Sequence, residues 1–260
     1  MNAPQEFDGR MAKVRQAMRD KGLQALLVFD AGRHNFLRTN YVAYLTDFIS
    51  VGPETILVLP LEEEPALYLT PVWDIPRAKH ESAVSDVRPF KEFWHRLPNL
   101  GSKIGLIGRE FMHVSLHDKI AQALKQPPVN TKEIIDSMAR RKSAFELERL
   151  KKAAAIADAG VQALHEDARV GLKEFELAAI VEYRMRFLGA EDNFGMVSAT
   201  VTIRRFTRRR IEPFKPAMSS SEKSPRASAD CSCKSAGPWL WESRRPWWRR
   251  NTIFSKRRWA

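Results

Sequence analysis

The stretch FDGRMAKVRQAMRDKGLQALLVF, residues 7–29, contains the two patterns that decide the fold of the first half of the chain. Its apolar residues recur at intervals of four, three and four, which predicts a helix with one buried face (Phe7, Met11, Val14 and Met18). Gly22 then supplies a helix stop, and residues 26–29 form the short apolar run that is typical of a buried strand. A helix that leads directly into a buried strand indicates a layered α/β domain.

The same alternation of helices and strands continues toward residue 130. Further strands are predicted at residues 55–59, 66–69, 84–87 and 103–108, and helices at residues 74–79 and 114–124. Because strands alternate with helices, we predict an α/β layer structure for residues 5–130.

The periodicity changes near residue 140, where a second domain is expected to begin. Ser143 and Glu146 form a capping box, in which each side chain accepts a hydrogen bond from an amide at a helix start. Apolar residues then follow at helical spacing up to Ala168, and Gly171 ends this helix. A second helix is predicted over residues 172–188, and residues 194–199 resemble the start of a strand.

The net charge of +12 belongs to one end of the chain. Residues 1–199 hold 27 Lys+Arg and 27 Asp+Glu, whereas residues 200–260 hold 16 Lys+Arg and 4 Asp+Glu. Both cysteines and five of the seven tryptophans also lie in residues 200–260. No helical or strand period persists there and like charges cluster, so we predict that this tail is disordered.

The composition limits the classes of protein to which the chain can belong. Two cysteines exclude a disulfide scaffold. The N-terminus has neither a basic region nor an apolar core, so no signal peptide is predicted. No apolar run approaches the roughly 18 residues that span a bilayer. Residues 1–199 contain no cysteine, and no export signal is predicted, so we expect a cytoplasmic protein that does not interact with membranes.

Two groups of residues before the tail have spacings that could support chemistry. His113 and His117 are four residues apart and would share one helix face, but no third metal ligand is evident, so two partly exposed histidines are expected instead. His165, Glu166 and Asp167 cluster near a helix end, where a solvated terminus is expected rather than a catalytic pair.

The tail offers two further possibilities. Cys231 and Cys233 would make half a metal site, but no second pair of cysteines and no tail histidine completes it. Arginine pairs and triplets alternate with tryptophans, which could neutralise phosphates and stack on bases without sequence preference. The sequence contains no Walker loop, glycine triad after a strand or nucleophile elbow.

Several stretches resemble the creatinase/prolidase/aminopeptidase P group, the M24 or "pita-bread" metallopeptidases. The helix and strand of residues 7–29 resemble the start of that group's N-terminal domain. Residues 40–46 resemble its Tyr-Leu-Thr-Gly segment, with Asp47 in place of the usual glycine. Residues 141–157 are similar to the start of its catalytic domain and are the most specific match, and residues 193–199 resemble the first catalytic strand.

The resemblance implies a three-layer α/β N-terminal domain over residues 5–135, then the start of an α+β catalytic domain over residues 140–199. Family members usually hold two divalent metal ions with two Asp, one His and two Glu, and activate a hydroxide that attacks a bond before proline. The creatinase branch uses a histidine base without metal. These ligands follow the strand at 194–199, and no residue of the 200–260 tail matches a ligand motif. We therefore assign no catalytic, metal-binding or cofactor-binding residue in this chain.

The composition of the tail is what a GC-rich gene yields when it is translated out of frame. When each codon's third base is read with the next codon's first two, residues 217–224 can spell Asp-Val-Ile-Leu-Gly-Glu-Ile-Thr, which resembles a family strand. Read from the last base of the Asp230 codon, residues 231–236 can likewise spell Leu-Phe-Leu-Gln-Ile-Cys. A single frameshift close to residue 200 is our hypothesis.

The sequence thus predicts a truncated M24-family hydrolase that is inactive as given, with helix faces left exposed by the missing strands. The resemblance implies that the intact parent hydrolyses a peptide substrate, most readily at an Xaa-Pro bond, or an amidine-type bond as in the creatinase branch. Two alternatives belong to other classes: a non-catalytic assembly module that forms a homodimer through the N-terminal domain, and a non-specific nucleic-acid binder acting through the tail.

Overall fold

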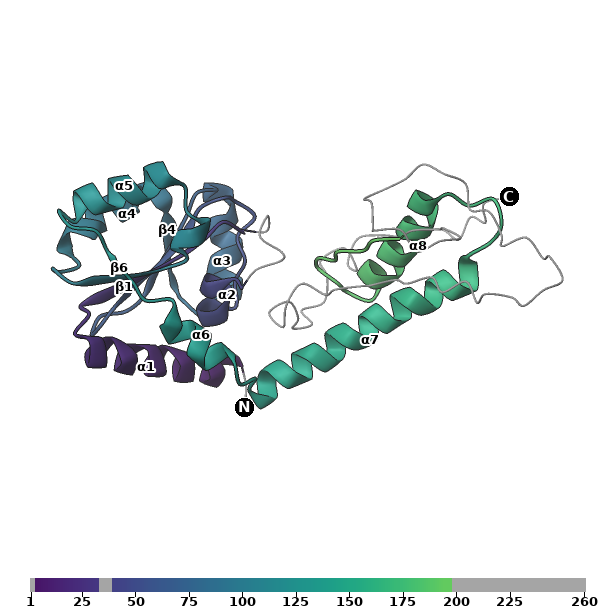
Figure 1. Ribbon diagram of the computed structural model, residues 1–260, viewed down its shortest axis with the longest axis horizontal. Helices are drawn as coiled ribbons and strands as arrows, with labels where there is room; N and C mark the ends of the chain where they lie inside the picture. Colours follow the sequence, from purple (N-terminus) through teal and green to yellow (C-terminus); the bar gives the residue numbers. More distant parts are fainter. Residues whose placement is uncertain (1–2, 33–38, 198–260) are drawn as a thin grey trace, which may run out of the picture. The chain divides into compact units, whose positions relative to one another are not determined.

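A computed structural model describes residues 3–32 and 39–197, with side chains from residue 5 onward. The chain divides into two units, residues 1–146 and residues 147–260. The predicted division into residues 5–135, 140–199 and 200–260 stays a prediction, because the tail lies outside the described residues. Figure 1 shows the elements of each unit.

The helices are α1 (Ala3–Lys21), α2 (Tyr41–Thr46), α3 (Ile75–Glu81), α4 (Phe90–Arg96), α5 (Val114–Ala123), α6 (Glu133–Ala139), α7 (Ala144–Asp167) and α8 (Glu174–Phe187). The strands are β1 (Ala25–Asp30), β2 (Thr55–Pro60), β3 (Ala66–Leu69), β4 (Asp86–Pro89), β5 (Ile104–Ile107) and β6 (Val129–Asn130). Short 3-10 turns are η2 (Val72–Asp74), η3 (Leu97–Asn99) and η4 (Arg109–Phe111). The short helices α2, α4 and α6 were not predicted, since six or seven residues carry too little periodicity.

One mixed sheet in the order β4-β3-β2-β1-β5-β6 forms the centre of the first unit. Strand β1 pairs with β2 in antiparallel fashion, so that Ala25 lies opposite Pro60 and Asp30 opposite Thr55. Strand β2 pairs antiparallel with β3, whereas β1–β5, β5–β6 and β3–β4 are parallel. Every residue of β1, β2, β3 and β5 is buried, which means that both faces of the sheet are covered.

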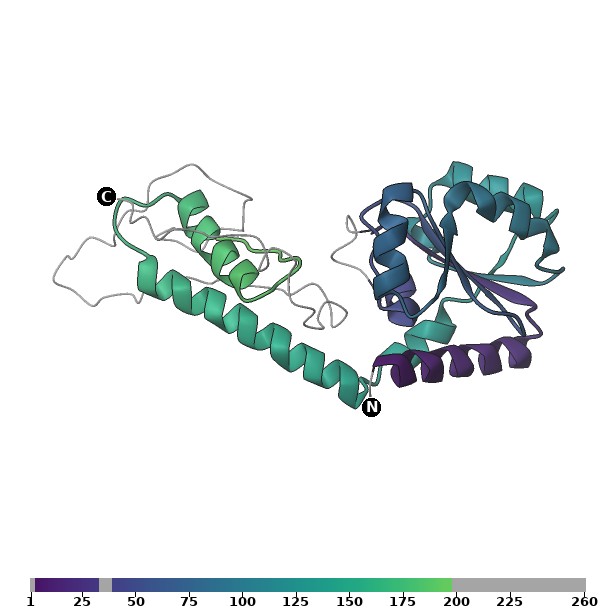
Figure 2. The same ribbon diagram turned by 180° about the vertical axis from the view of Figure 1, so that it is seen from behind.

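Helices cover the sheet on both sides, which confirms the predicted three-layer α/β fold. On one side, Leu27 and Phe29 belong to a core cluster that includes Phe93 of α4 and Leu116 of α5. Figures 1 and 2 show α4 and α5 on this side and α1 and α6 on the other. The predicted apolar face of α1 is buried, from Phe7 to Met18.

A buried arginine links α1 with α2 and with the first turn of α7. Both Nε and Nη2 of Arg10 donate to Glu6 Oε1, at 3.0 and 2.7 Å, and Nη1 donates to the Tyr44 carbonyl oxygen at 2.8 Å. Its Nη2 also lies 3.3 Å from Glu146 Oε2. The guanidinium stacks over the Tyr44 ring at 4.2 Å. Because all these groups are buried, the carboxylates compensate a charge that would be costly to bury alone.

The start of α7 confirms the predicted capping box. Ser143 Oγ accepts from the Glu146 amide at 3.2 Å, and Glu146 Oε2 accepts from the Ser143 amide at 2.9 Å. The neighbouring Phe145 ring packs edge-on against Phe7, with 6.1 Å between centroids. Glu146 therefore has two roles, as a helix cap and as a partner of Arg10.

In the second unit, α8 packs against α7 through one apolar stripe. Leu177, Val181 and Met185 form a buried cluster with Leu164. Gly160 makes the close approach feasible, because a Cβ at this position would lie 2.8 Å from Met185 Cγ. Both helices end close to their predicted limits.

The predicted strand at residues 194–199 is wrong over the described part. Only Phe194 makes a bridge, residues 195–197 are not strand, and residues 198 and 199 lie outside the described residues. A strand requires a neighbouring strand to take its hydrogen bonds. None of the described residues of the second unit forms one.

The conformation of Asp47 explains why glycine is usual after the Tyr-Leu-Thr segment. Asp47 caps α2 with φ 58° and ψ 19°, in the left-handed region, and its amide donates to the Ala43 carbonyl oxygen. Residues with a Cβ pay a steric cost in this region, whereas glycine does not. Asp47 therefore adopts a left-handed backbone conformation that glycine would adopt at a lower steric cost.

We expect Asp47→Gly to be more stable than Asp47→Ala by about 1 kcal/mol, because both variants lose the carboxylate and only alanine keeps the strained Cβ. Urea unfolding followed by circular dichroism measures the difference. The same comparison at exposed Lys13 within α1 should have the opposite sign, with alanine about 1 kcal/mol more stable than glycine. Equal stability of the two variants at position 47 would contradict the left-handed cap.

Candidate functional site

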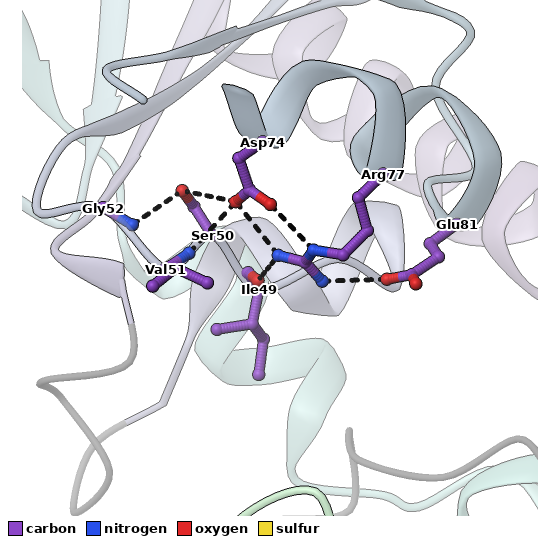
Figure 3. A network of polar contacts seen from close by, with 7 residues as sticks. All are labelled: Ile49, Ser50, Val51, Gly52, Asp74, Arg77 and Glu81. Atoms are coloured by element: carbon purple, nitrogen blue, oxygen red, sulfur yellow. Dashed lines mark hydrogen bonds and ion pairs between the residues drawn. The ribbon is translucent and has the colours of Figure 1, made fainter. Parts of the chain in front are cut away.

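A buried carboxylate fixes two adjacent loops at one end of the sheet, as Figure 3 shows. Asp74, at the end of η2, is fully buried. Its Oδ2 accepts from the Val51 amide at 3.1 Å and from Ser50 Oγ at 3.3 Å. Ser50 Oγ in turn accepts from the Gly52 amide at 3.1 Å. One side chain thus holds the loop of residues 50–52 against η2.

Arg77 completes this network from the first turn of α3. Its Nε donates to Asp74 Oδ1 at 2.7 Å and its Nη2 to Asp74 Oδ2 at 3.0 Å. Its Nη1 donates to Glu81 Oε2 at 2.8 Å, and Nη2 also donates to the Ile49 carbonyl oxygen at 2.9 Å. The guanidinium lies 4.4 Å from the centre of the Phe48 ring. All three guanidinium nitrogens of Arg77 therefore donate hydrogen bonds, as expected for a well-ordered ion pair.

The electrostatics of the pair agree with this geometry. Burial would raise the pKa of Asp74, but hydrogen bonds from Arg77 and from the Val51 amide outweigh it and hold the pKa below its ordinary value. Burial would also lower the pKa of Arg77, whereas Asp74 and Glu81 raise it above its ordinary value. Both groups stay charged at neutral pH, and the network persists.

Above this rigid base, the two loops present apolar side chains to solvent. Trp73 is 71% exposed and Val72 is 60% exposed, both on η2. Val51, on the facing loop, is 39% exposed. The loops touch closely, because a Cβ at Gly52 would collide with the Pro71 ring. We call Val51, Val72 and Trp73 the Trp73 surface. An exposed tryptophan on a rigid support is typical of a contact surface.

A second buried carboxylate lies at the end of β1. Asp30 Oδ1 accepts from the Gly32 amide at 2.7 Å and from Asn40 Nδ2 at 2.9 Å. Asn40 Oδ1 accepts from the Ala43 amide and so caps α2. Asp30 Oδ2 and the facing Thr55 Oγ1 are buried and have no hydrogen-bond partner among the described residues. Burial raises the pKa of Asp30 to about 7, against the opposing effect of the Gly32 amide.

The histidines and acids singled out in the sequence lie apart from these two groups. His113 is the exposed N-cap residue of α5, with an extended backbone, and His117 lies partly buried in the first turn of this helix. This agrees with the expectation of two partly exposed histidines near a helix start. His117 Nδ1 lies 3.4 Å from Asp118 Oδ1. His165, Glu166 and Asp167 are exposed in the last turn of α7, and Glu166 accepts from Gln162 Nε2 at 2.9 Å.

The remaining predictions concern residues outside the described part of the chain. Cys231, Cys233 and the arginines and tryptophans of residues 200–260 all fall there. Within residues 3–32 and 39–197, no group of three or more His, Cys, Asp or Glu side chains could hold a metal ion. The described residues therefore do not fit the two-metal ligand set that the family resemblance implies.

Sequence reasoning missed Asp74, Arg77 and Asp30. The spacing of Arg77 and Glu81, four residues apart on a helix, was a visible signal of an ion pair. The pairing of Asp74 with Ser50 and Val51 had no such signal, because 23 or more residues separate the partners.

Several solved structures share this fold. The chain is similar to the prolidase from Pyrococcus furiosus, with 23% identity and a TM-score of 0.62 over 78% of this chain and 62% of that one. The X-Pro aminopeptidase from Thermotoga maritima shares 22% identity, with a TM-score of 0.64 over 78% of this chain and 57% of that one. Aminopeptidase P from E. coli shares 18% identity, with a TM-score of 0.58 over 76% of this chain and 53% of that one.

The family itself is defined by sequence. Residues 10–141, half of the chain, match the Creatinase/Prolidase N-terminal domain. The chain belongs to this family, as the resemblance indicated. It spans between 53% and 62% of the length of the three solved structures above. No curated protein matches it. The described helices include none that is long and apolar enough to cross a membrane.

The raised pKa of Asp30 makes the stability of the first unit depend on pH. The fold favours the neutral form of the Asp30 carboxyl. The stability that this group contributes to the fold is therefore fully present below about pH 4 and is lost as the pH rises through about 7. Asp30→Asn keeps an acceptor for Gly32 and Asn40 and cannot ionise. We therefore expect its stability relative to the parent to rise by on the order of 3 kcal/mol between about pH 4 and about pH 8.

Urea unfolding at several pH values measures this change for Asp30→Asn. The matched control is the same exchange at exposed Asp8 of α1, and the difference from the parent should change more with pH for Asp30→Asn than for this control. A constant difference for Asp30→Asn would contradict the raised pKa.

Proposed function

We propose that this chain carries the N-terminal part of an M24 hydrolase that cleaves Xaa-Pro bonds, and that the chain as given does not catalyse this reaction. The observation that supports the parent activity is the family match over residues 10–141, together with folds shared with a prolidase and two proline-specific aminopeptidases. The reaction would use two divalent metal ions held by residues of the parent's catalytic domain.

The proposed inactivity rests on the sequence after residue 199. The family's metal ligands follow the strand that starts the catalytic domain, and residues 200–260 match none of the ligand motifs. In the shifted frame, residues 217–224 can spell a sequence that resembles a family strand. We therefore propose that a shift of reading frame near residue 200, and not a change in the N-terminal domain, makes this chain inactive.

The test is to sequence the gene across codons 195–205 and to express both frames. We expect no hydrolysis of an Xaa-Pro dipeptide by this chain with added Mn²⁺, Co²⁺ or Zn²⁺, and hydrolysis by the protein whose frame is restored with one nucleotide change. Turnover by this exact chain would contradict the inactivity. No turnover by the folded, restored protein on any Xaa-Pro substrate would contradict the parent function.

A second candidate function, assembly through the N-terminal domain, is favoured by the Trp73 surface. Three exposed apolar side chains stand on loops that the Asp74–Arg77 pair holds rigid, so little conformational freedom is lost when they bind. Tryptophan is enriched among the residues that dominate interface energies. We propose that two copies associate through this surface.

Trp73→Ala should weaken this association about tenfold or more, because truncating an interface anchor removes its buried area. Sedimentation at tens of micromolar measures the effect. Val114→Ala, at an exposed valine on α5, is the matched control and should leave association unchanged. Equal association of Trp73→Ala and the parent would rule out this surface.

A further inference from the structure

Helix α8 has two apolar faces, and within the described residues 147–197 only one of them packs against a neighbour. Leu177, Val181 and Met185 are buried in the cluster with α7. Phe175, Tyr183 and Phe187 are 44%, 71% and 51% exposed. An amphipathic helix at a domain surface normally exposes polar residues on the side away from the core. The second apolar face of α8 is therefore a feature that packing within the described unit does not explain.

The exposed aromatic residues form one continuous ridge. At about 100° of rotation per residue, Phe175, Ala179, Tyr183 and Phe187 fall within a sector of about 120°. They follow one another at intervals of four, which is the spacing of the ridges that pack between helices. The Tyr183 and Phe187 rings contact each other at 6.1 Å between centroids. We call these four residues the α8 ridge.

The α8 ridge is complementary to itself when two copies run antiparallel. Phe175 and Phe187 lie at equal distances from its middle, and so do Ala179 and Tyr183. An antiparallel pair therefore places Phe175 opposite the partner's Phe187. It also places the large Tyr183 opposite the small Ala179, as ridge-into-groove packing requires. A parallel pair would instead place each tyrosine against a tyrosine.

The charges beside the ridge select the same orientation. Glu176 lies in the first turn of α8 and Arg186 in its last turn, and both fall within the same sector as the ridge. In the antiparallel register, Glu176 lies opposite the partner's Arg186, and this pair occurs twice. A parallel register would bring like charges together, which is unfavourable. Arg186 Nη1 also donates to the Glu191 carbonyl oxygen at 3.1 Å, which restrains its position.

We propose that α8 is a self-association surface, on which a second copy of this chain docks its own α8 in antiparallel orientation. The interface is isologous and closes as a two-fold pair. Three partly exposed rings bury about 300–400 Å² per copy, below the roughly 800 Å² per partner of a standard interface, so the pair is weak. The proposal depends on neither the hydrolase function nor the Trp73 surface.

A charge exchange tests the orientation directly. In a Trp73→Ala background, which removes any contribution of the Trp73 surface, the parent α8 should form dimers at high micromolar concentration. Glu176→Arg and Arg186→Glu should each associate at least about tenfold more weakly, because each places like charges opposite one another twice. An equal mixture of the two variants should regain the dimer, since every facing pair is then opposite in charge.

Sedimentation velocity measures the mass of each variant and of the mixture, and circular dichroism verifies that α8 remains folded. Tyr183→Ser should also abolish the dimer, whereas Val170→Ser, at a 67% exposed valine outside α8, should not. The proposal is supported if the parent forms a dimer, each charge variant alone does not, and the mixture of the two variants does. A monomeric parent, or a mixture no more associated than its components, overturns it.

Discussion

Arg10 carries a positive charge in the interior of the first unit, and the positions of α1, α2 and the first turn of α7 depend on how that charge is compensated. Glu6 approaches it from the same helix, the Tyr44 carbonyl from α2, and Glu146 from the first turn of α7. Removal of one partner from a buried charged group costs far more than the pair contributes, so the three elements must keep their places together. The same glutamate caps α7, which couples the helix start to the unit's core.

The Asp74–Arg77 pair applies the same constraint at another place in the unit. Its carboxylate is fully buried and engages two loops, and its guanidinium reaches a carbonyl oxygen, a second carboxylate and an aromatic ring. Such a network has few alternative arrangements, so the loops are held in one conformation. Exposed apolar residues on those loops are thus presented in a fixed geometry, which lowers the entropy cost of a contact.

The second unit shows the opposite situation, in which apolar surface has no fixed neighbour among the described residues. Helix α8 uses one stripe to pack on α7, where Gly160 permits a close approach. Its other stripe remains exposed. Exposed apolar surface favours association, and the large and small residues of the α8 ridge, together with the opposite charges of Glu176 and Arg186, are complementary in an antiparallel pair.

The sequence by itself determined the helices and strands with clear periods, the capping box at Ser143 and Glu146, and the change of composition near residue 200. These features are local, because apolar spacing and capping act within a few residues. Only the tertiary structure decided the order of the strands, the burial of Asp30 and the partners of Asp74. The left-handed conformation of Asp47 and the second apolar face of α8 were likewise visible only in three dimensions. The strand order and the environments of Asp30 and Asp74 depend on groups distant in sequence, whose contacts decide whether a side chain is buried.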